Sequence, residues 1–215
     1  MKSPIKLIKA NLDINAGFTL IELLVATIIM SIVVTTALTG FIAILQQNQK
    51  AEMETQRRTN LNRALDYIAN DIRRANRIEA GRATGEIMKL SIAEVQLVGR
   101  ANKFNYDASF VSYATQAIDQ TKIWEGPTTI TRKTATTSSL LASATTNLLV
   151  DGIKAPSTSP TCPTDSTLNG SDGFYACIYS GGTKVDLYLY GKLSDNSNET
   201  MEVKSTVYTR SQQLN

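Results

Sequence analysis

The pattern of the first fifty residues is a polar start followed by a long apolar run. Residues 1–17 are polar and carry lysines, whereas residues 18–49 are almost wholly apolar. No charged side chain occurs from Leu23 to Gln49. These 27 residues, at about 1.5 Å each in a helix, are long enough to cross a hydrocarbon core of about 30 Å. The pattern therefore predicts one transmembrane helix.

After Gln49 the chain becomes polar but keeps a helical period. Apolar side chains recur at three- and four-residue spacing, at Leu61, Leu65, Ile68 and Ile72. No proline or glycine interrupts residues 41–80. We therefore expect residues 50–80 to form an amphipathic second half of the same helix, with its apolar stripe packed on a sheet.

Residues 81–215 are expected to form a β-rich head domain. Gly81 and Gly85 are expected to end the helix, and Gly181-Gly182 indicates a hairpin turn. Alternation and β-branched content predict strands over Ile87–Val98, Ser109–Thr115, Thr128–Arg132, Phe174–Tyr179, Val185–Tyr190 and Val203–Tyr208. Two segments are predicted as loops, Thr134–Asn147 (with a weak strand as the alternative) and Pro156–Gly173. The fold class is therefore α+β, a long helix packed on an antiparallel sheet.

The polar start ends at Ala16-Gly17, ahead of the apolar run. A secretory signal instead places its small-residue cleavage site after the apolar region. A cut after Gly17 would remove residues 1–17 as a leader and leave the hydrophobic helix on the mature chain. The lysines ahead of the helix predict a cytoplasmic N-terminal end, so that Lys50 onward lies on the other side of the membrane.

One carboxylate, that of Glu22, lies near the start of the apolar run. A charged residue at the centre of a membrane helix costs about 2.5–3.5 kcal/mol on insertion scales. Two interpretations remain open. Glu22 either lies at the headgroup boundary, or it neutralises the free amine of Phe18 on a neighbouring subunit.

The run Gly17-Phe18-Thr19-Leu20-Ile21-Glu22-Leu23-Leu24-Val25-Ala26 resembles the processing and assembly motif of type IV prepilins and type II secretion pseudopilins. The resemblance implies that a membrane peptidase cuts after Gly17 and methylates Phe18, and that Glu22 sets register during assembly. It implies three partners: other pilin or pseudopilin subunits, the prepilin peptidase and an inner-membrane assembly platform. The chain would span the inner membrane once, with a periplasmic or extracellular C-terminal domain, and then enter a pilus or pseudopilus.

Within the family that the chain resembles, further features indicate a minor subunit that initiates or caps assembly. Major pilins usually have a proline within the membrane helix, but this chain has none between Pro4 and Pro127, and whether the helix bends at Gly40 is open. Residues 65–75 resemble the corresponding helix of larger minor pilins and J-type minor pseudopilins. Segments beginning at Trp124, Leu149 and Gly173 resemble minor pilin-like proteins of cyanobacteria.

Two cysteines, Cys162 and Cys177, lie close together in a chain that is expected to be exported. Exported thiols tend to be oxidised, so one disulfide is the simplest prediction, with two free buried thiols as the alternative. The bond would close a ring of about sixteen residues and stabilise the fold by about 3 kcal/mol. The resemblance implies that it staples a variable loop.

The composition argues against an enzyme. The chain has no histidine, the side chain best suited to proton transfer near neutral pH and a common metal ligand. It also has no phosphate-binding glycine loop, metal-spaced cluster or activated serine pattern. The formal charge is +3, but Lys2, Lys6 and Lys9 lie in the leader against only Asp13. The mature chain is therefore nearly neutral.

Arg73, Arg74 and Arg77 form a candidate ligand face on the predicted helix, opposite the apolar stripe. They would contact DNA or an acidic polysaccharide, which makes a filament-tip binding module for adhesion or competence the second candidate function. The simpler interpretation is a solvated face, or one that faces adjacent subunits, whose arginines pair with acidic residues that include Asp66 and Asp71.

Residues 195–199, Asp-Asn-Ser-Asn-Glu, offer oxygen ligands for a structural calcium ion. They lack the glycine and the terminal spacing of an EF-hand loop, which favours a solvated turn over a calcium site. No other cofactor is expected.

Overall fold

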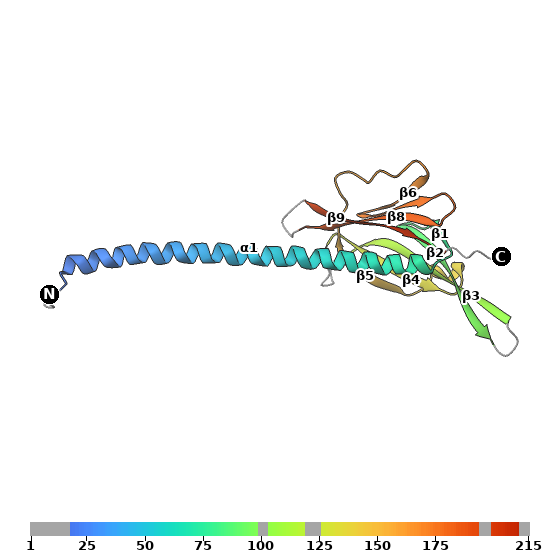
Figure 1. Cartoon of the computed structure of the whole chain (residues 1–215), viewed down its shortest axis with the longest axis horizontal. Coiled ribbons are helices and arrows are strands. Elements are labelled where there is room, and N and C mark those ends of the chain that lie inside the picture. Colours follow the sequence, from blue (N-terminus) through green and yellow to red (C-terminus); the bar gives the residue numbers. More distant parts are fainter. Residues whose placement is uncertain (1–17, 99–102, 119–125, 194–198, 211–215) are drawn as a thin grey trace, which may run out of the picture. The chain divides into compact units, whose positions relative to one another are not determined.

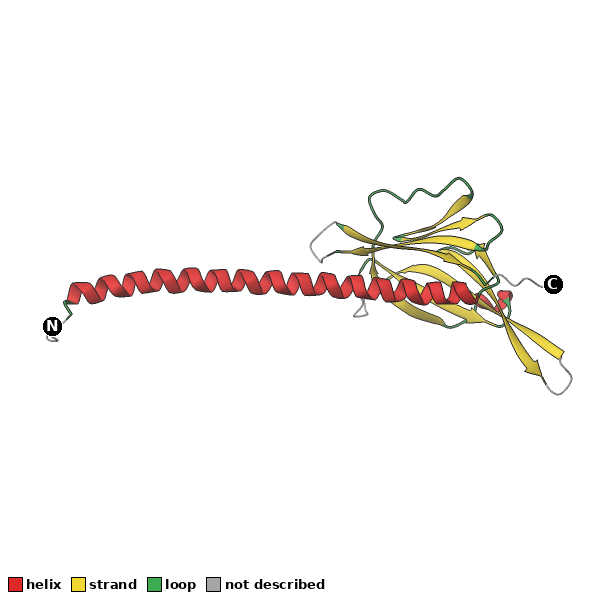
Figure 2. Ribbon diagram, in the orientation of Figure 1, coloured by secondary structure: helices red, strands yellow, loops and turns green. Residues whose placement is uncertain are grey.

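The computed structural model describes residues 18–98, 103–118, 126–193 and 199–210. The chain divides into two compact units, residues 1–49 and residues 50–215. Within the described residues there are one α-helix and nine strands (Figures 1 and 2). All the strand pairs are antiparallel, which confirms the predicted α+β class.

The helix α1 (Leu20–Arg74) starts in the first unit and is unbroken at Gly40. Up to residue 49 all its side chains are exposed, and among the described residues it is the one helix long and apolar enough to cross a membrane. Its hydroxyl groups bond back to carbonyl oxygens three or four residues earlier, at Thr27, Ser31, Thr35, Thr36 and Thr39. These bonds satisfy polar groups that would otherwise be costly in hydrocarbon.

In the second unit α1 packs its predicted apolar stripe into the core. Leu61, Leu65, Ile68 and Ile72 are at most 5% exposed, together with Ala64 and Ala69 between them. They contact buried side chains of the sheet, so the amphipathic interpretation of this segment is confirmed. The contact is close at Gly191, where an added Cβ would lie 2.5 Å from Leu61 Cδ1.

The helix ends earlier than expected. It stops at Arg74, and β1 (Arg77–Ala80) follows in place of the last predicted helical turn. The amide of Asn76 already bonds to Ser91 O on the next strand. Ile78 is buried between exposed Arg77 and half-buried Glu79, which is a strand alternation that a four-residue segment is too short to reveal in sequence.

The remaining strands include the six that were predicted and two that were not. The elements are β2 (Glu86–Val98), β3 (Lys103–Ala117), β4 (Thr128–Ala135), a short 3₁₀ helix η1 (Ser138–Leu141), β5 (Thr146–Ile153), β6 (Ser166–Ser171), β7 (Phe174–Tyr179), β8 (Lys184–Lys192) and β9 (Thr200–Tyr208). The unpredicted β6 lies inside the predicted loop Pro156–Gly173, and β5 begins at the end of the predicted loop Thr134–Asn147. Gly181 and Gly182 form the predicted turn, with φ of 95° and 67°.

The sheet consists of two groups of strands. Its order is β1-β2-β3-β4-β5-β8-β7-β6, and β9 pairs with the free side of β8. The two groups, β1–β5 and β6–β9, join through a single strand pair, Ile153 with Gly191. A buried core of aliphatic and aromatic side chains from both groups packs against the apolar stripe of α1.

Candidate assembly motif and ligand surfaces

The start of α1 is closed by a reciprocal pair of side chains. Glu22 Oε2 accepts hydrogen bonds from Thr19 N at 3.0 Å and from Thr19 Oγ1 at 2.9 Å. Thr19 Oγ1 in turn accepts from Glu22 N at 3.3 Å. This is a capping box, which satisfies backbone donors at a helix N-terminus. All three contacts leave Glu22 Oε1 able to accept a bond from another molecule.

The apolar side chains that follow the capping box are exposed and have no partners in the part of the chain that the structure describes. Phe18 is 87% exposed, and large aliphatic side chains from Leu20 to Leu45 are 42–82% exposed. So large an apolar surface marks contact with lipid or with other helices. The apolar side chains of residues 18–49 therefore require lipid or helices of other molecules to cover them.

Residues 14–38 match the family model of the prokaryotic N-terminal methylation motif. The match supports a type IV pilin or pseudopilin. The matched segment contains Gly17, Phe18 and Glu22, but it ends at Leu38 and does not reach the head domain. Gly17 lies outside the described residues, so its cleavage remains a prediction. No curated protein and no solved structure matches the chain.

The two cysteines form a disulfide, Cys162 to Cys177, with Cα atoms 5.6 Å apart. The predicted bond is present, and neither thiol is free. Cys177 lies on β7 between the core residues Ala176 and Ile178, so its side chain faces the outer side of the sheet. It is nevertheless fully buried. The ring that it closes contains β6.

The three candidate arginines are not on one helix face. Arg73 and Arg74 occupy the last turn of α1 and are exposed, whereas Arg77 lies on β1. The prediction of a single helical face is wrong for Arg77, because the helix has already ended. Arg77 Nε lies 3.9 Å from Glu79 Oε1. Neither Arg73 nor Arg74 has an ion-pair partner within the described part of the chain.

Two further cations lie at the same end of the head domain. Arg210 N donates to Ala75 O at 3.1 Å, and Thr209 N donates to Thr183 O at 2.9 Å. These bonds bring Arg210 and Lys184 to the end of α1. We call the resulting set the basic end: Arg73, Arg74, Arg77, Lys184 and Arg210.

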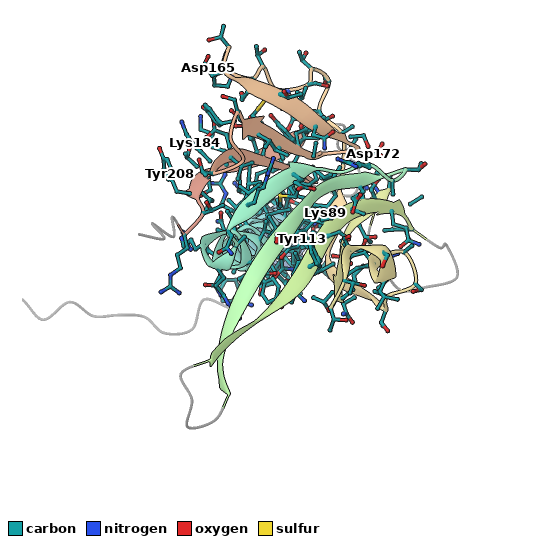
Figure 3. All side chains as sticks on the ribbon, turned by 90° about the vertical axis from the view of Figure 1, so that its right-hand side faces the viewer. Lys89, Tyr113, Asp165, Asp172, Lys184 and Tyr208 are labelled. Atoms are coloured by element: carbon teal, nitrogen blue, oxygen red, sulfur yellow. A yellow bond between two sulfur atoms is a disulfide. The ribbon has the colours of Figure 1, made fainter. Side chains whose placement is uncertain are left out.

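Tyrosines adjoin the basic end at Lys184. Its Nζ lies 3.9 Å from the ring centroid of Tyr179 and 5.8 Å from that of Tyr208, which is 61% exposed (Figure 3). The contact with Tyr179 raises the pKa of Lys184, so the ammonium remains charged at neutral pH. The sequence predicted Arg73, Arg74 and Arg77 as part of this surface but not Lys184, Tyr208 and Arg210, because these lie more than 100 residues further along the chain.

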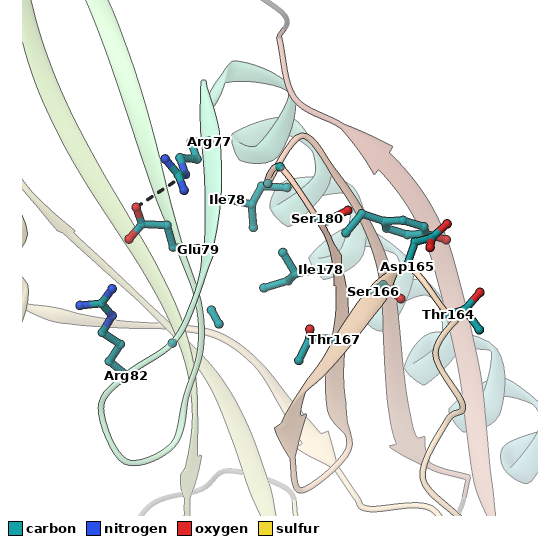
Figure 4. Close-up of a pocket in the computed structure, with 15 residues that line it drawn as sticks. Arg77, Ile78, Glu79, Arg82, Thr164, Asp165, Ser166, Thr167, Ile178 and Ser180 are labelled. Atoms are coloured by element: carbon teal, nitrogen blue, oxygen red, sulfur yellow. Dashed lines mark ion pairs between the residues drawn. The ribbon is translucent and has the colours of Figure 1, made fainter.

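A cleft of about 730 Å³ lies between β1 and the β6–β7 pair (Figure 4). Ile78 N of β1 donates to Gly182 O at 2.8 Å, so a hydrogen bond connects two residues that line the cleft, and next to the cleft Asn169 Nδ2 of β6 donates to Ile87 O of β2. Apolar Ile178 lines the cleft beside hydroxyl groups and the carboxylate of Asp165. The lining can bind polar groups.

A buried polar cluster ties α1 to the sheet. Asp71 Oδ2 accepts from Tyr113 Oη at 2.6 Å and from Arg132 Nε at 2.8 Å. Arg132 also stacks over Tyr67, at 5.4 Å from the ring centroid. Asp71 is only 4% exposed, so its prediction as part of a solvated face is wrong. In the sequence Asp71 stands three residues after Ile68, on the apolar stripe, and this spacing indicates a buried position.

The electrostatics of this cluster follow from burial and the Asp71 charge. Burial raises the pKa of Tyr113, and the hydrogen bond to Asp71 raises it further. Burial acts to lower the pKa of Arg132, but the bond and charge of Asp71 outweigh it and the pKa is raised. The cluster therefore holds a neutral tyrosine and an ion pair.

The calcium prediction covers residues 195–199, of which 195–198 lie outside the described residues, and it stays a prediction. Elsewhere, in the part of the chain that is described, no three Asp, Glu, Cys or His side chains group as a metal site. Trp124 also lies outside the described residues.

Proposed function

We propose that this chain is a structural, non-enzymatic subunit of a type IV pilus or of a type II secretion-like pseudopilus. The observation that carries the proposal is an exposed apolar helix that begins at a methylation motif. Such a helix is stable in a bilayer or in a bundle of similar helices, and unstable in water.

In this proposal the subunit passes through two stages, first in the membrane and then in the filament. It first spans the inner membrane once, with residues 50–215 on the periplasmic or extracellular side. The prepilin peptidase cuts after Gly17 and methylates the new amino terminus at Phe18. The assembly platform then moves the subunit into a filament, where neighbouring helices replace lipid around residues 18–49.

Glu22 is the proposed assembly residue. In the isolated chain its Oε2 is held by Thr19, at the position that favours negative charge at a helix N-terminus. In the filament its carboxylate would pair with the Phe18 amine of a neighbouring subunit, using the oxygen that the capping box leaves open. A buried carboxylate is tolerated when it is paired in this way.

We place the subunit among the minor ones, which initiate or cap assembly. The membrane half of α1 has no proline, and the head domain carries, within its described residues, nine strands and an internal disulfide. The likeness to J-type minor pseudopilins and to cyanobacterial minor pilins is part of this proposal.

The direct test is the intact mass of the protein purified from membranes that contain a prepilin peptidase. We expect loss of residues 1–17 and one added methyl group on Phe18. Gly17→Val should block the cut, whereas Asn11→Ala, a control change elsewhere in the leader, should not. A mature product that still contains Lys2 would refute the proposal.

The minor role has a separate test. Deleting the gene should reduce filament number, together with whichever of adhesion, DNA uptake or secretion depends on the filament. Complementation with the wild-type gene should restore both the filament number and the affected activity. Normal values for all of these in the deletion strain would count against a role in initiation or capping.

A second candidate function is a binding module at the filament tip. It is favoured by the basic end, where Arg73 and Arg74 have no ion-pair partner within the described residues and Tyr208 is exposed. Cations interleaved with aromatic rings suit DNA or an acidic polysaccharide. This function is compatible with the structural one.

A further inference from the structure

Two lysines and a serine stand in one row across three neighbouring strands. Lys89 of β2 is paired with Ser112 of β3, and Ser112 is paired with Lys133 of β4. Lys89 alternates with the fully buried Met88 and Leu90, so the row lies on the outer face of the sheet. Neighbouring strands are about 4.8 Å apart, so the two lysine positions are about 10 Å apart.

This row lines a cleft of about 410 Å³ that η1 borders on the other side; we call it the η1 cleft. Its volume falls in the range of about 300–1,000 Å³ that is typical of small-ligand sites. Ser112 is 5% exposed and Leu141 of η1 is 6% exposed. Arg82, from the turn between β1 and β2, and Glu86, the first residue of β2, complete the charged part of the lining.

The carboxylates near the η1 cleft are already engaged. Lys89 Nζ lies 3.3 Å from Glu79 Oε2. Glu86 Oε2 accepts from the backbone amides of Arg82 and Ala83, at 2.9 and 3.2 Å. Lys133 is half-buried and has no carboxylate partner in the described part of the chain. A half-buried cation without a counter-ion favours an anion from solution.

The charge balance limits what that anion can be. Four cations, those of Arg77, Arg82, Lys89 and Lys133, lie against two carboxylates, those of Glu79 and Glu86, which leaves two positive charges. Because these cations come from separate strands, two positive charges match the two carboxylates of an acidic disaccharide better than one compact phosphate ion. The other lining groups are hydroxyls, of Thr84, Ser112 and Ser138, and apolar surfaces, of Ala114, Leu141 and Ala142.

We propose that the η1 cleft binds a carboxylate-bearing saccharide. Lys133 and Arg82 bind the carboxylate, the hydroxyl groups bond to those of the sugar, and the alanine and leucine surfaces contact its C–H face. The proposal adds a ligand to the filament subunit and uses a surface separate from the basic end. It does not depend on the cut after Gly17, so the mass test and the binding test can fail independently.

The test is calorimetric titration of the full chain in a polyoxyethylene detergent, which contains no sugar. The probes are digalacturonate, lactose as an uncharged disaccharide, and inorganic phosphate. We expect saturable binding of digalacturonate and none of lactose. Lys133→Gln should weaken the binding about tenfold or more, because it removes a charge-assisted hydrogen bond. Lys204→Gln, at an exposed position on β9, is the matched control and should bind as wild type.

A second variant guards against misfolding of the first. Ala142→Trp places a large side chain in the cleft from an exposed position, and should abolish binding while the melting temperature stays unchanged. Three results would overturn the proposal. They are no binding of digalacturonate, equal affinity in wild type and Lys133→Gln, and tighter binding of phosphate than of digalacturonate.

Discussion

Glu22 is held by Thr19 in the isolated chain and, by the proposed function, also pairs with the Phe18 amine of a neighbouring subunit in the filament. Glu22→Gln keeps the shape of the side chain and an oxygen that can accept from Thr19, but removes the charge. Membrane insertion and the cut after Gly17 should be unchanged. Incorporation into filaments should fall about tenfold or more, because breaking a buried ion pair costs about 3–5 kcal/mol. Quantitative immunoblots of sheared filaments and membranes measure this ratio.

Thr19→Ser is the control for this prediction. Serine retains the hydroxyl of the capping box and leaves Glu22 ionised, so incorporation should match wild type. If Glu22→Gln enters filaments as well as Thr19→Ser does, the charge of Glu22 has no role in assembly, and the headgroup interpretation of this residue is favoured.

Tyr113 makes the stability of the head domain sensitive to alkaline pH. Its pKa is raised in the folded chain, first by burial and then by Asp71, whereas an unfolded tyrosine ionises near pH 10. Above about pH 10 the unfolded chain therefore releases a proton that the folded chain keeps. Stability should fall there by up to about 1.4 kcal/mol per pH unit from this residue, and it should be fully retained below pH 10.

Tyr113→Phe tests this origin. It removes the ionisable hydroxyl, so the loss of stability above pH 10 should become shallower in thermal melts at a series of pH values. Tyr208→Phe, which removes an exposed hydroxyl, is the matched control. Melting curves of Tyr113→Phe and wild type that decline in parallel would show that Tyr113 does not contribute.

The sequence could predict some of these residues and not others. Gly17, Phe18 and Glu22 are contiguous and stand in a fixed order, so their roles could be proposed from ten letters of sequence. Asp71 and Arg132 are separated by 61 residues, and only the folded sheet brings them together. Long-range pairs of this kind leave no local pattern in the sequence.

At the scale of elements, the sequence predicts a helix or strand wherever a periodic segment is long. α1 and the strands β2, β3, β4, β7, β8 and β9 were all predicted in this way. β1 has four residues, and its single buried side chain, Ile78, also fits a helical spacing after Ala75. β6 has a polar sequence that does not predict a strand. It forms one because it pairs with β7 inside the ring that the disulfide closes.

The disulfide should stabilise the part of the sheet that it closes. Replacing both cysteines, Cys162→Ser with Cys177→Ala, should lower the free energy of unfolding by about 3 kcal/mol in the loop-entropy model. The melting temperature should fall by roughly 5–10 °C. Wild type in dithiothreitol should melt at the same lower temperature, and Ser159→Ala, in the same loop, should melt as wild type. An unchanged melting temperature after reduction would contradict this role.

At the scale of the whole molecule, the charge is unevenly distributed. The mature chain is close to neutral, yet five cations gather at the basic end. Arg73 and Arg74 also lie in the last turn of α1, where cations stabilise a helix, so their presence alone does not require a ligand. Stability and binding therefore have to be measured on the same variants.

The decisive variant is Arg73→Ala with Arg74→Ala, measured by fluorescence anisotropy with duplex DNA and the full chain in detergent. If the basic end binds DNA, affinity should fall for all DNA sequences alike, and the slope of log affinity against log salt should decrease by roughly 2, one for each lost phosphate contact. The control is Arg58→Ala with Arg63→Ala, which removes two exposed arginines from an earlier part of α1. An equal loss of DNA affinity in both double variants would mean that binding depends only on the total charge of the chain. A change in melting temperature without any change in affinity would leave the arginines with only a structural role at the helix end.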